Sequence, residues 1–336
     1  MSFDVVVNGR FLSRRITGVE RYGREILRCL GEHVQVVQPL RYIHGVKGHV
    51  WEQIILPGRI PAKSTLWSPA NTGPLAVSNQ VLTIHDLTPL EHPEWFRPTF
   101  TLWYRLILPL LVHRVRRVVT LSEHVRAKLL ARFNLSHERV IAIPAGVNLT
   151  CFHPLDLPAN KRRYILFVGS LEPRKNLSVL LEAWKLIENQ YPDVSLVLAG
   201  ITGRVFRRFN LPADIDRVQF AGYVSEDDLP ALYAGATVFV LPSLDEGFGL
   251  TVLEAMACGT PVLASNGGAL PEVVGDAGIL FDPNNPSSLA RSLSDCLTDG
   301  FLNRTLRQKG LERAEHFSWP LAAELIWQIL DGMDAT

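Results

Sequence analysis

Two glutamates, Glu246 and Glu254, frame the glycine-bearing stretch LPSLDEGFGLTVLEAMACG at residues 241–259. The pattern predicts the end of a strand, a loop, and a helix that begins near Gly249 and carries Glu254 in its opening turns. Glycines allow positive φ and close approach of a ligand, and the N–H groups of a helix start bind anions. Ionised carboxylates accept hydrogen bonds from sugar hydroxyls. The stretch favours binding of a phosphate-bearing sugar; a solvated turn before an ordinary helix is the alternative.

A pair of cations, Arg174 and Lys175, lies in a second predicted strand-to-helix loop, within LFVGSLEPRKN at residues 166–176. In an open α/β sheet such loops lie on the side where ligands bind. Two positive charges there can neutralise a leaving diphosphate. The alternative is a solvated surface pair.

A histidine, His85, and Asp86 follow directly on the predicted strand 81–84. With Glu91 and His92 they could be drawn as a metal cluster. We reject that interpretation because no two of them have the i, i+4 spacing of helical ligands and the segment contains prolines. No metal site is therefore predicted.

Several motifs resemble the signature of glycosyltransferase family 4, a family of retaining enzymes with the GT-B fold. The signature residues are Glu246, Gly247, Phe248, Gly249, Leu250 and Glu254, followed by Ala255, Gly259, Thr260, Pro261 and Val262. The resemblance extends to residues 166–176, 220–236 and 267–283, so it covers 160–320. The GSLEPRKN form resembles enzymes of bacterial surface-polysaccharide assembly.

The resemblance implies a role for individual residues. The implied catalytic residues are Glu246, which positions the sugar, His85, which lies against the donor sugar, and Arg174 and Lys175, which stabilise the diphosphate. The implied donor-binding residues are Gly18, Tyr223, Val224, Phe248, Gly249, Leu250, Thr251 and Glu254, the last of which holds the ribose. One position departs from the family, because Ser170 follows Gly169 where many relatives have an arginine.

The implied activity is a retaining, metal-independent transfer of a hexose to a hydroxyl acceptor, without a cofactor. UDP-glucose and GDP-mannose are the expected donors, and exopolysaccharide or lipopolysaccharide O-antigen biosynthesis is the expected setting. Two other classes stay open. One is another GT-B enzyme: an epimerase would change the nucleotide sugar without an acceptor, and a phosphorylase would require inorganic phosphate. The other is a catalytically silent protein that only binds the nucleotide sugar.

Strand and helix patterns alternate along the chain, which predicts two Rossmann-like α/β domains. A linker rich in proline and charge, FHPLDLPANKRR at 152–163, separates them. We expect an N-terminal acceptor domain at 1–155 and a C-terminal donor domain at 160–316, which face a cleft. A last helix at 317–336 is expected to cross back to the first domain.

Composition excludes other classes of protein. The 336 residues carry 34 basic and 33 acidic side chains for a net charge of +1, so bulk charge gives no reason to expect a nucleic-acid partner. Four scattered cysteines give no metal-ligand or disulfide pattern. The N-terminus lacks the basic start and long apolar core of a signal peptide, so a cytoplasmic protein is expected.

One local charge imbalance suggests a membrane surface as a partner. Residues 99–139 contain eight Arg or Lys and two Glu, a net of +6 (8 − 2), interleaved with apolar residues such as Trp103, Leu106 and Leu110. That mixture is typical of segments at an anionic interface. We therefore expect a peripheral protein at the inner face of the membrane and a glycan or polyprenyl-linked acceptor. A buried helix with a charged rim is the alternative.

Overall fold

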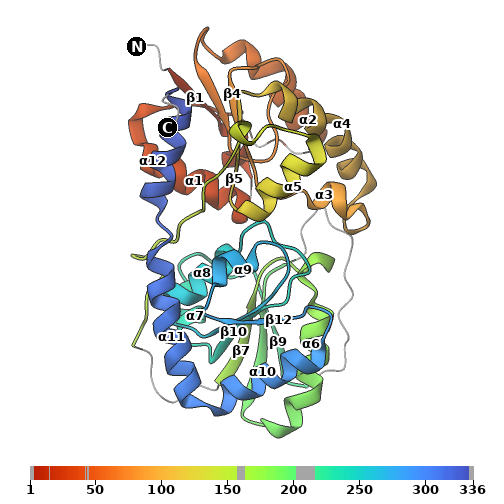
Figure 1. The fold of residues 1–336 in the computed structure, drawn as a ribbon, viewed down its shortest axis with the longest axis vertical. Coiled ribbons are helices and arrows are strands. Elements are labelled where there is room, and N and C mark those ends of the chain that lie inside the picture. The colour runs from red at the N-terminus through yellow and green to blue at the C-terminus, as the bar shows by residue number, and fades with distance from the viewer. Residues whose placement is uncertain are drawn as a thin grey trace. The chain divides into compact units, whose positions relative to one another are not determined.

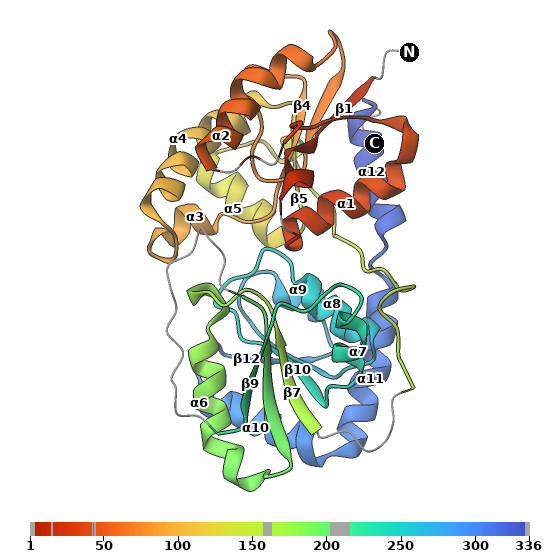
Figure 2. The same ribbon diagram turned by 180° about the vertical axis from the view of Figure 1, so that it is seen from behind.

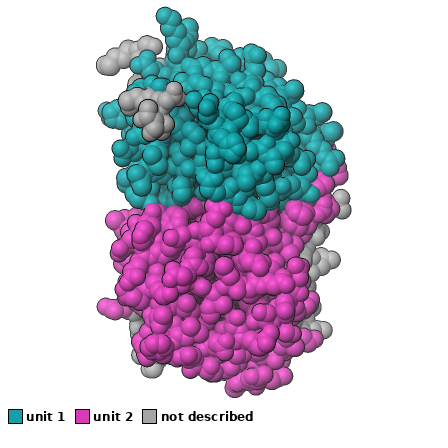
Figure 3. Space-filling model, in the orientation of Figure 1, with its two compact units in different colours: residues 1–91, 101–146, 318–336 teal, residues 92–100, 147–317 magenta. Residues whose placement is uncertain are grey.

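The structure is a computed structural model that describes residues 4–14, 16–41, 43, 45–156, 163–201 and 216–332. The chain divides into two compact units, which Figure 3 colours separately. Unit 1 comprises residues 1–91, 101–146 and 318–336, and unit 2 comprises residues 92–100 and 147–317. The break after Gly146 lies earlier in the chain than the expected linker at 152–163, of which residues 157–162 lie outside the described residues.

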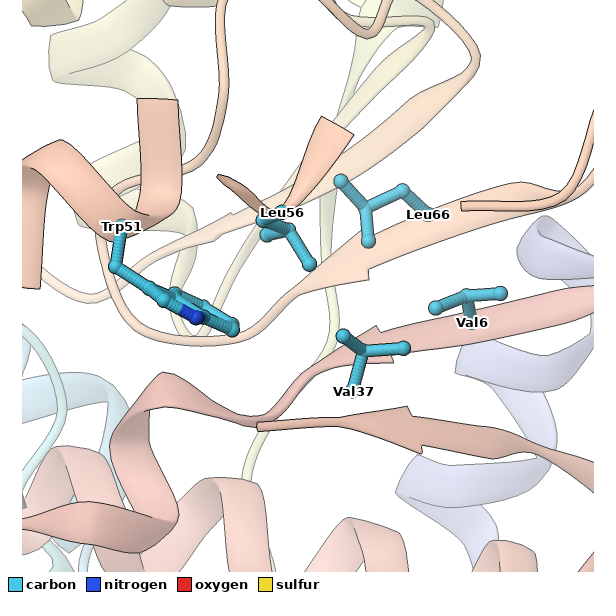
Figure 4. Close-up of a cluster of buried hydrophobic side chains, with 5 residues drawn as sticks. All are labelled: Val6, Val37, Trp51, Leu56 and Leu66. Atoms are coloured by element: carbon cyan, nitrogen blue, oxygen red, sulfur yellow. The ribbon is translucent and has the colours of Figure 1, made fainter. Parts of the chain in front are cut away.

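Unit 1 contains a six-stranded parallel sheet with strand order β2-β1-β3-β4-β5-β6. Its strands are β1 (Val5–Asn8), β2 (Gln35–Val37), β3 (Thr65–Ser68), β4 (Gln80–Ile84), β5 (Arg117–Thr120) and β6 (Val140–Ala142). They are short apolar runs with little alternation, as expected for strands that are covered on both faces. Figure 4 shows the core where the sheet packs on a helix, built from Val6, Val37, Trp51, Leu56 and Leu66.

The helices of unit 1 connect these strands. They are α1 (Gly18–Leu30), α2 (Gly45–Val50), which continues into the π-helix η3 (Trp51–Ile55), α3 (Thr88–Glu91), α4 (Pro98–Arg114) and α5 (Glu123–Phe133). We made no clear prediction for the α2–η3 segment, because its glycines and prolines are spread among apolar residues. The strand order of this sheet reverses direction between β1 and β3. The carboxyl ends of these two strands therefore form the switch point of unit 1.

The last helix, α12 (Trp319–Leu330), packs on α1 of unit 1 (Figures 1 and 2). Trp319 makes an edge contact with Tyr22, with ring centroids 6.0 Å apart, and is 3% exposed. The expected return of a C-terminal helix to the first domain is confirmed. The helix begins at Trp319 rather than at residue 317, and residues 333–336 lie outside the described part of the chain.

Unit 2 contains a second six-stranded parallel sheet, with strand order β12-β11-β10-β7-β8-β9. The strands are β7 (Arg163–Val168), β8 (Val194–Ala199), β9 (Val218–Gly222), β10 (Val238–Leu241), β11 (Val262–Ser265) and β12 (Ile279–Phe281). The helices are α6 (Leu177–Ile187), α7 (Leu229–Ala234), α8 (Leu250–Ala257), α9 (Leu270–Val274), α10 (Pro286–Thr298) and α11 (Gly300–Glu315). Read from β9, the order is that of a Rossmann sheet, 3-2-1-4-5-6, so its switch point lies between β7 and β10.

Three arginines of residues 99–139 donate to backbone carbonyls within unit 1. Arg139 donates through Nη2 to three carbonyl oxygens at the end of α4, those of Val112, His113 and Val115. Arg126 donates to the carbonyl of Val140 at 2.7 Å, and Arg116 donates to that of Ile329. Carbonyls at helix ends lack intrahelical donors, and a guanidinium satisfies them well. These three side chains therefore have partners inside unit 1, and the membrane contact of the segment stays a prediction.

Candidate functional site

The loops at the switch point of unit 2 carry the charged residues singled out in the sequence. Arg174 and Lys175 lie in η7 (Pro173–Lys175), which follows β7, and Glu246 lies in the loop that follows β10. Because β7 and β10 are adjacent parallel strands, both loops leave the same edge of the sheet. The topology therefore brings together residues that are about seventy positions apart in sequence.

Both cations bind the same carboxylate. Arg174 Nη1 donates to Glu246 Oε2 at 2.7 Å, and Lys175 Nζ donates to Glu246 Oε1 at 2.5 Å. Ser243 Oγ donates to Oε1 as well, at 2.6 Å. Lys175 and Glu246 are each 7% exposed, so these residues form a buried cluster and are not a solvated surface pair.

The charges of this cluster hold Glu246 ionised. Burial by itself raises the pKa of the Glu246 carboxyl, but Arg174, Lys175 and the hydrogen bonds from Lys175 and Ser243 outweigh burial and lower the pKa to about 2. A carboxylate with so low a pKa is a weak base and a weak nucleophile. Its oxygens are better suited to fix neighbouring groups than to attack a substrate.

A second carboxylate, Glu172, completes the cluster, and we did not predict it from the sequence. It is fully buried, and its Oε1 accepts a hydrogen bond from Arg174 Nε at 3.0 Å and lies 2.9 Å from Arg174 Nη2 in an ion pair. Ser170 Oγ donates to its other oxygen at 2.8 Å. Burial raises the pKa of Glu172 above its ordinary value despite these donors. The position of Glu172, two residues before the cations in a strand-to-helix loop, could have indicated it.

The start of α8 lies directly after Glu246. Gly249 is its N-cap residue with φ of 122°, a conformation that residues with a Cβ rarely adopt, so the positive φ expected of a glycine here is confirmed. Gly268, with φ of 64°, leaves a Cβ position only 2.3 Å from Glu246 N, which shows how closely the segment 267–268 packs under the loop. Phe248 is 6% exposed and packs edge-on against Phe317, so its side chain belongs to the core of unit 2.

The other predicted donor-binding residues of unit 2 lie apart from this cluster. Leu250 and Thr251 open α8 and are half-buried, whereas Glu254 in the next turn is 3% exposed and accepts a hydrogen bond from Tyr233 Oη at 2.8 Å. Tyr223 and Val224 follow the edge strand β9, and Tyr223 is 51% exposed. The structure does not test their roles in binding.

His85 lies at the carboxyl end of β4 in unit 1, as predicted. Its Nε2 lies 2.8 Å from the carbonyl oxygen of Pro69, and its ring packs against Tyr22 at 5.0 Å between centroids. A carbonyl only accepts hydrogen bonds, so Nε2 carries the proton and Nδ1 is an acceptor. Burial lowers the pKa of His85, although the Pro69 carbonyl, Asp86 and Glu20 oppose this. The neutral ring can therefore accept a hydrogen bond from a hydroxyl through Nδ1.

Gly18 is the first residue of α1 and is exposed, so it lies where the sequence predicted it. Near it at the switch point of unit 1 lies a buried ionic network that the sequence did not reveal. Arg10 pairs with Glu52 of η3, and Asn8 donates to Glu52 Oε1 at 2.8 Å. Arg10 and Glu52 are 42 positions apart, so no local pattern could have indicated this pair.

Among the described residues, no group of three or more His, Cys, Asp or Glu side chains is arranged to hold a metal ion. None of the helices in these parts of the chain is long and apolar enough to cross a bilayer.

Comparison with known proteins gives matches over both units. The family described as Glycosyl transferases group 1 matches residues 155–313, and the family described as Glycosyltransferase Family 4 matches residues 64–150. O-antigen chain mannosyltransferase B of Escherichia coli is 32% identical over 263 residues, which are 73% of this chain and 68% of that protein. The serotype-specific mannosyltransferase WbdA of E. coli is 32% identical over 266 residues, 73% of this chain but only 32% of its own length.

A solved structure shares the fold. HepE of Anabaena, crystallised in complex with UDP and glucose, matches with a TM-score of 0.73 and 18% identity, over 98% of this chain and 99% of that one. With the two parallel sheets, this likeness confirms the predicted two-domain α/β fold of the GT-B class.

Proposed function

The chain belongs to glycosyltransferase family 4, the group 1 glycosyltransferases, and from this premise we propose that it transfers a hexose with retention of anomeric configuration. The donor is a nucleotide diphosphate sugar bound by unit 2. The acceptor is a hydroxyl of a glycan, carried on a polyprenyl diphosphate and bound by unit 1. The reaction needs no metal ion.

The buried cluster of Glu172, Arg174, Lys175 and Glu246 is the observation that carries this proposal. It lies at the carboxyl edge of β7 and β10, directly before the N-terminus of α8, and both features favour an anion. When the bond between the sugar and the diphosphate breaks, negative charge grows on the phosphate oxygens. Fixed cations and N–H groups in a buried site stabilise that charge without reorganising.

Arg174 and Lys175 have different roles in this proposal. Arg174 donates to Glu172 through Nε, with Nη2 completing the ion pair, and donates to Glu246 and the carbonyl of Asp245 through Nη1. The guanidinium is thereby fixed against the protein and positions Glu246. Lys175 Nζ donates to a single carboxylate oxygen among the described residues, and an ammonium has three protons. We therefore assign the diphosphate contact mainly to Lys175.

The chemical step follows from these assignments. The acceptor oxygen attacks the anomeric carbon on the face from which the diphosphate leaves, and the acceptor proton passes to the departing phosphate oxygen. Glu246 acts as a positioning group for the sugar, because its low pKa makes it unsuited to be a nucleophile. His85 accepts a hydrogen bond from a sugar hydroxyl through Nδ1.

The names of the relatives support mannose over glucose as the first sugar to test, and polysaccharide biosynthesis as the setting. GDP-mannose is accordingly the first candidate donor, and UDP-glucose is the second. The base of the nucleotide is proposed to bind near Tyr223 and Val224, and its ribose near Glu254.

The test begins with thermal unfolding of the protein in the presence of GDP, UDP and ADP. A nucleotide that binds only the folded state raises the unfolding temperature, and we expect GDP to raise it most. Transfer from GDP-mannose or UDP-glucose to a lipid diphosphate-linked glycan is then followed by NMR of the new anomeric centre.

An inverted product would contradict retention. Conversion of the donor without an acceptor would show an epimerase, dependence on inorganic phosphate would show a phosphorylase, and binding without turnover would show a silent protein.

A further inference from the structure

The exposed aliphatic side chains of unit 1 are concentrated in two segments. Nine large hydrophobic residues described in this unit are exposed, and all but Leu321 lie within residues 40–55 and 102–110. These eight are Leu40, Val46, Val50, Ile54, Ile55, Leu102, Leu106 and Leu110. Single exposed leucines are common on protein surfaces, but a contiguous group marks an interaction surface.

In each segment these side chains form a stripe along one helical face. Leu102, Leu106 and Leu110 recur every four residues along α4 and are 58%, 59% and 59% exposed. Val46, Val50 and Ile54 have the same spacing along α2 and η3 and are 78%, 46% and 70% exposed. Side chains four apart lie on one side of a helix, so each stripe is continuous.

The two stripes belong to neighbouring helices. The rings of His49 in α2 and Trp103 in α4 are 4.3 Å apart between centroids, and Figures 1 and 2 both show the two helices side by side. We call the six side chains Val46, Val50, Ile54, Leu102, Leu106 and Leu110 the two-helix surface. The opposite face of α4 is also apolar, because Tyr104, Leu108 and Leu111 are buried in unit 1. A helix that is apolar on both faces normally has a partner on each.

The charges around the two-helix surface have one sign. Within residues 45–59 and 101–114 the exposed charged side chains are Lys47, Arg59, Arg105 and Arg114. The single acid there, Glu52, is 1% exposed and pairs with Arg10. A second copy of this chain would bring like charges together across a symmetric interface, which is unfavourable. An anionic lipid surface attracts the same cations and accepts the aliphatic side chains.

We propose that unit 1 docks on an anionic lipid bilayer through the two-helix surface. The aliphatic stripes enter the boundary between headgroups and acyl chains, while Lys47 and Arg105 contact lipid phosphates. This surface differs from the segment 99–139 expected from the sequence, because it includes α2 and η3 and leaves out Arg116, Arg126 and Arg139, which donate to backbone carbonyls. The proposal rests on the proposed function in one respect: docking would bring unit 1 to a lipid-linked acceptor.

The experiment is flotation of the full chain with vesicles of phosphatidylcholine, alone or mixed with phosphatidylglycerol. We expect the wild type to float with the anionic vesicles, and less at high salt because salt screens the cations. The double variant Leu102→Asp, Leu106→Asp should lose binding on the order of tenfold for each leucine. The variant Lys47→Glu, Arg105→Glu should lose binding to anionic vesicles by about 25-fold for each residue, because each reversal changes the charge by two and one charge is worth about fivefold.

The matched control is the double variant Leu186→Asp, Phe301→Asp, which changes two side chains of unit 2 that are 54% and 72% exposed. It should float like the wild type. The proposal is overturned if the wild type does not float, if the Leu102, Leu106 variant floats like the wild type, or if the control loses binding equally. It is also overturned if sedimentation shows a wild-type dimer that the Leu102, Leu106 variant dissociates, because the surface then joins two copies.

Nucleotide binding separates this proposal from the proposed function. Each variant is also measured by thermal unfolding with GDP and UDP, to which the two-helix surface should contribute nothing. If flotation fails but a nucleotide still stabilises the protein and transfer occurs, only docking is refuted. If the protein floats but neither binds a nucleotide nor transfers a sugar, only the proposed function is refuted.

Discussion

Replacing Glu246 by Gln removes one charge from the buried cluster while it preserves the shape of the side chain. The drop in the pKa of Glu246 from an ordinary 4.5 to about 2 corresponds to about 3 kcal/mol at pH 7, because each tenfold change in proton affinity is worth about 1.4 kcal/mol. The variant also leaves Arg174 and Lys175 facing a neutral amide. We therefore expect Glu246→Gln to lower the free energy of unfolding by about 3 kcal/mol.

The same substitution should affect catalysis and nucleotide binding in opposite ways. With Glu246 neutral, Lys175 no longer shares its charge with a carboxylate, so the affinity for free nucleoside diphosphate should stay equal or increase. The sugar loses its positioning group, so turnover at saturating donor should fall by at least about 100-fold, a loss in the range seen for single positioning or transition-state contacts.

Urea unfolding followed by tryptophan fluorescence, calorimetric titration with GDP and UDP, and initial rates at saturating donor measure the three quantities. Glu182→Gln, an exposed change on α6 of the same unit, is the matched control and should alter none of them. Full turnover of Glu246→Gln, or an unchanged unfolding free energy at pH 7, would refute the role that we assign to this carboxylate.

Three further predictions concern the same unit. Because the pKa of Glu246 is depressed in the folded state, its contribution to stability is present above about pH 4.5 and is lost as the pH falls toward 2. Urea unfolding at several pH values should show this loss in the wild type, and an identical loss in Glu246→Gln would contradict the prediction. Lys175→Ala should reduce turnover strongly and the unfolding temperature only slightly. Arg174→Ala should reduce both, because it removes the partner of two buried carboxylates. The reverse result would show that Lys175 is the structural cation. Glu254→Ala should weaken nucleoside diphosphate binding by roughly 1.5 to 3 kcal/mol in calorimetry, and unchanged affinity would remove the ribose role.

The sequence by itself determined the regular elements and the loops that carry the charges. The predicted strand 81–84 is present as β4 (Gln80–Ile84), and the helix predicted to begin near Gly249 is α8, which begins at Leu250. Short apolar runs and helical periodicity are set by neighbouring residues, so they can be recognised locally. In parallel sheets the loops at the carboxyl ends of adjacent strands share one edge. Glu246 and Lys175 could therefore be placed on the binding side before their contact was known.

Segments with weak local patterns were not determined in this way. The structure contains α2, η3 and the strand β12, none of which we predicted from the sequence. Glycine and proline are dispersed through the α2–η3 segment, and β12 has only three residues. Such elements form because the rest of the sheet and core provides partners, and local propensity contributes little.

Only the tertiary structure decided which partners the charged and apolar side chains have. Periodicity marks α4 as apolar on more than one face, but it cannot show that Leu108 and Leu111 are buried whereas Leu106 and Leu110 are exposed. It likewise cannot show that Arg139 binds the carbonyls at the end of α4, nor that Glu172 fixes Arg174. A residue's type and spacing encode its backbone conformation locally, while the identity of its contact depends on which distant segment the folded chain brings beside it.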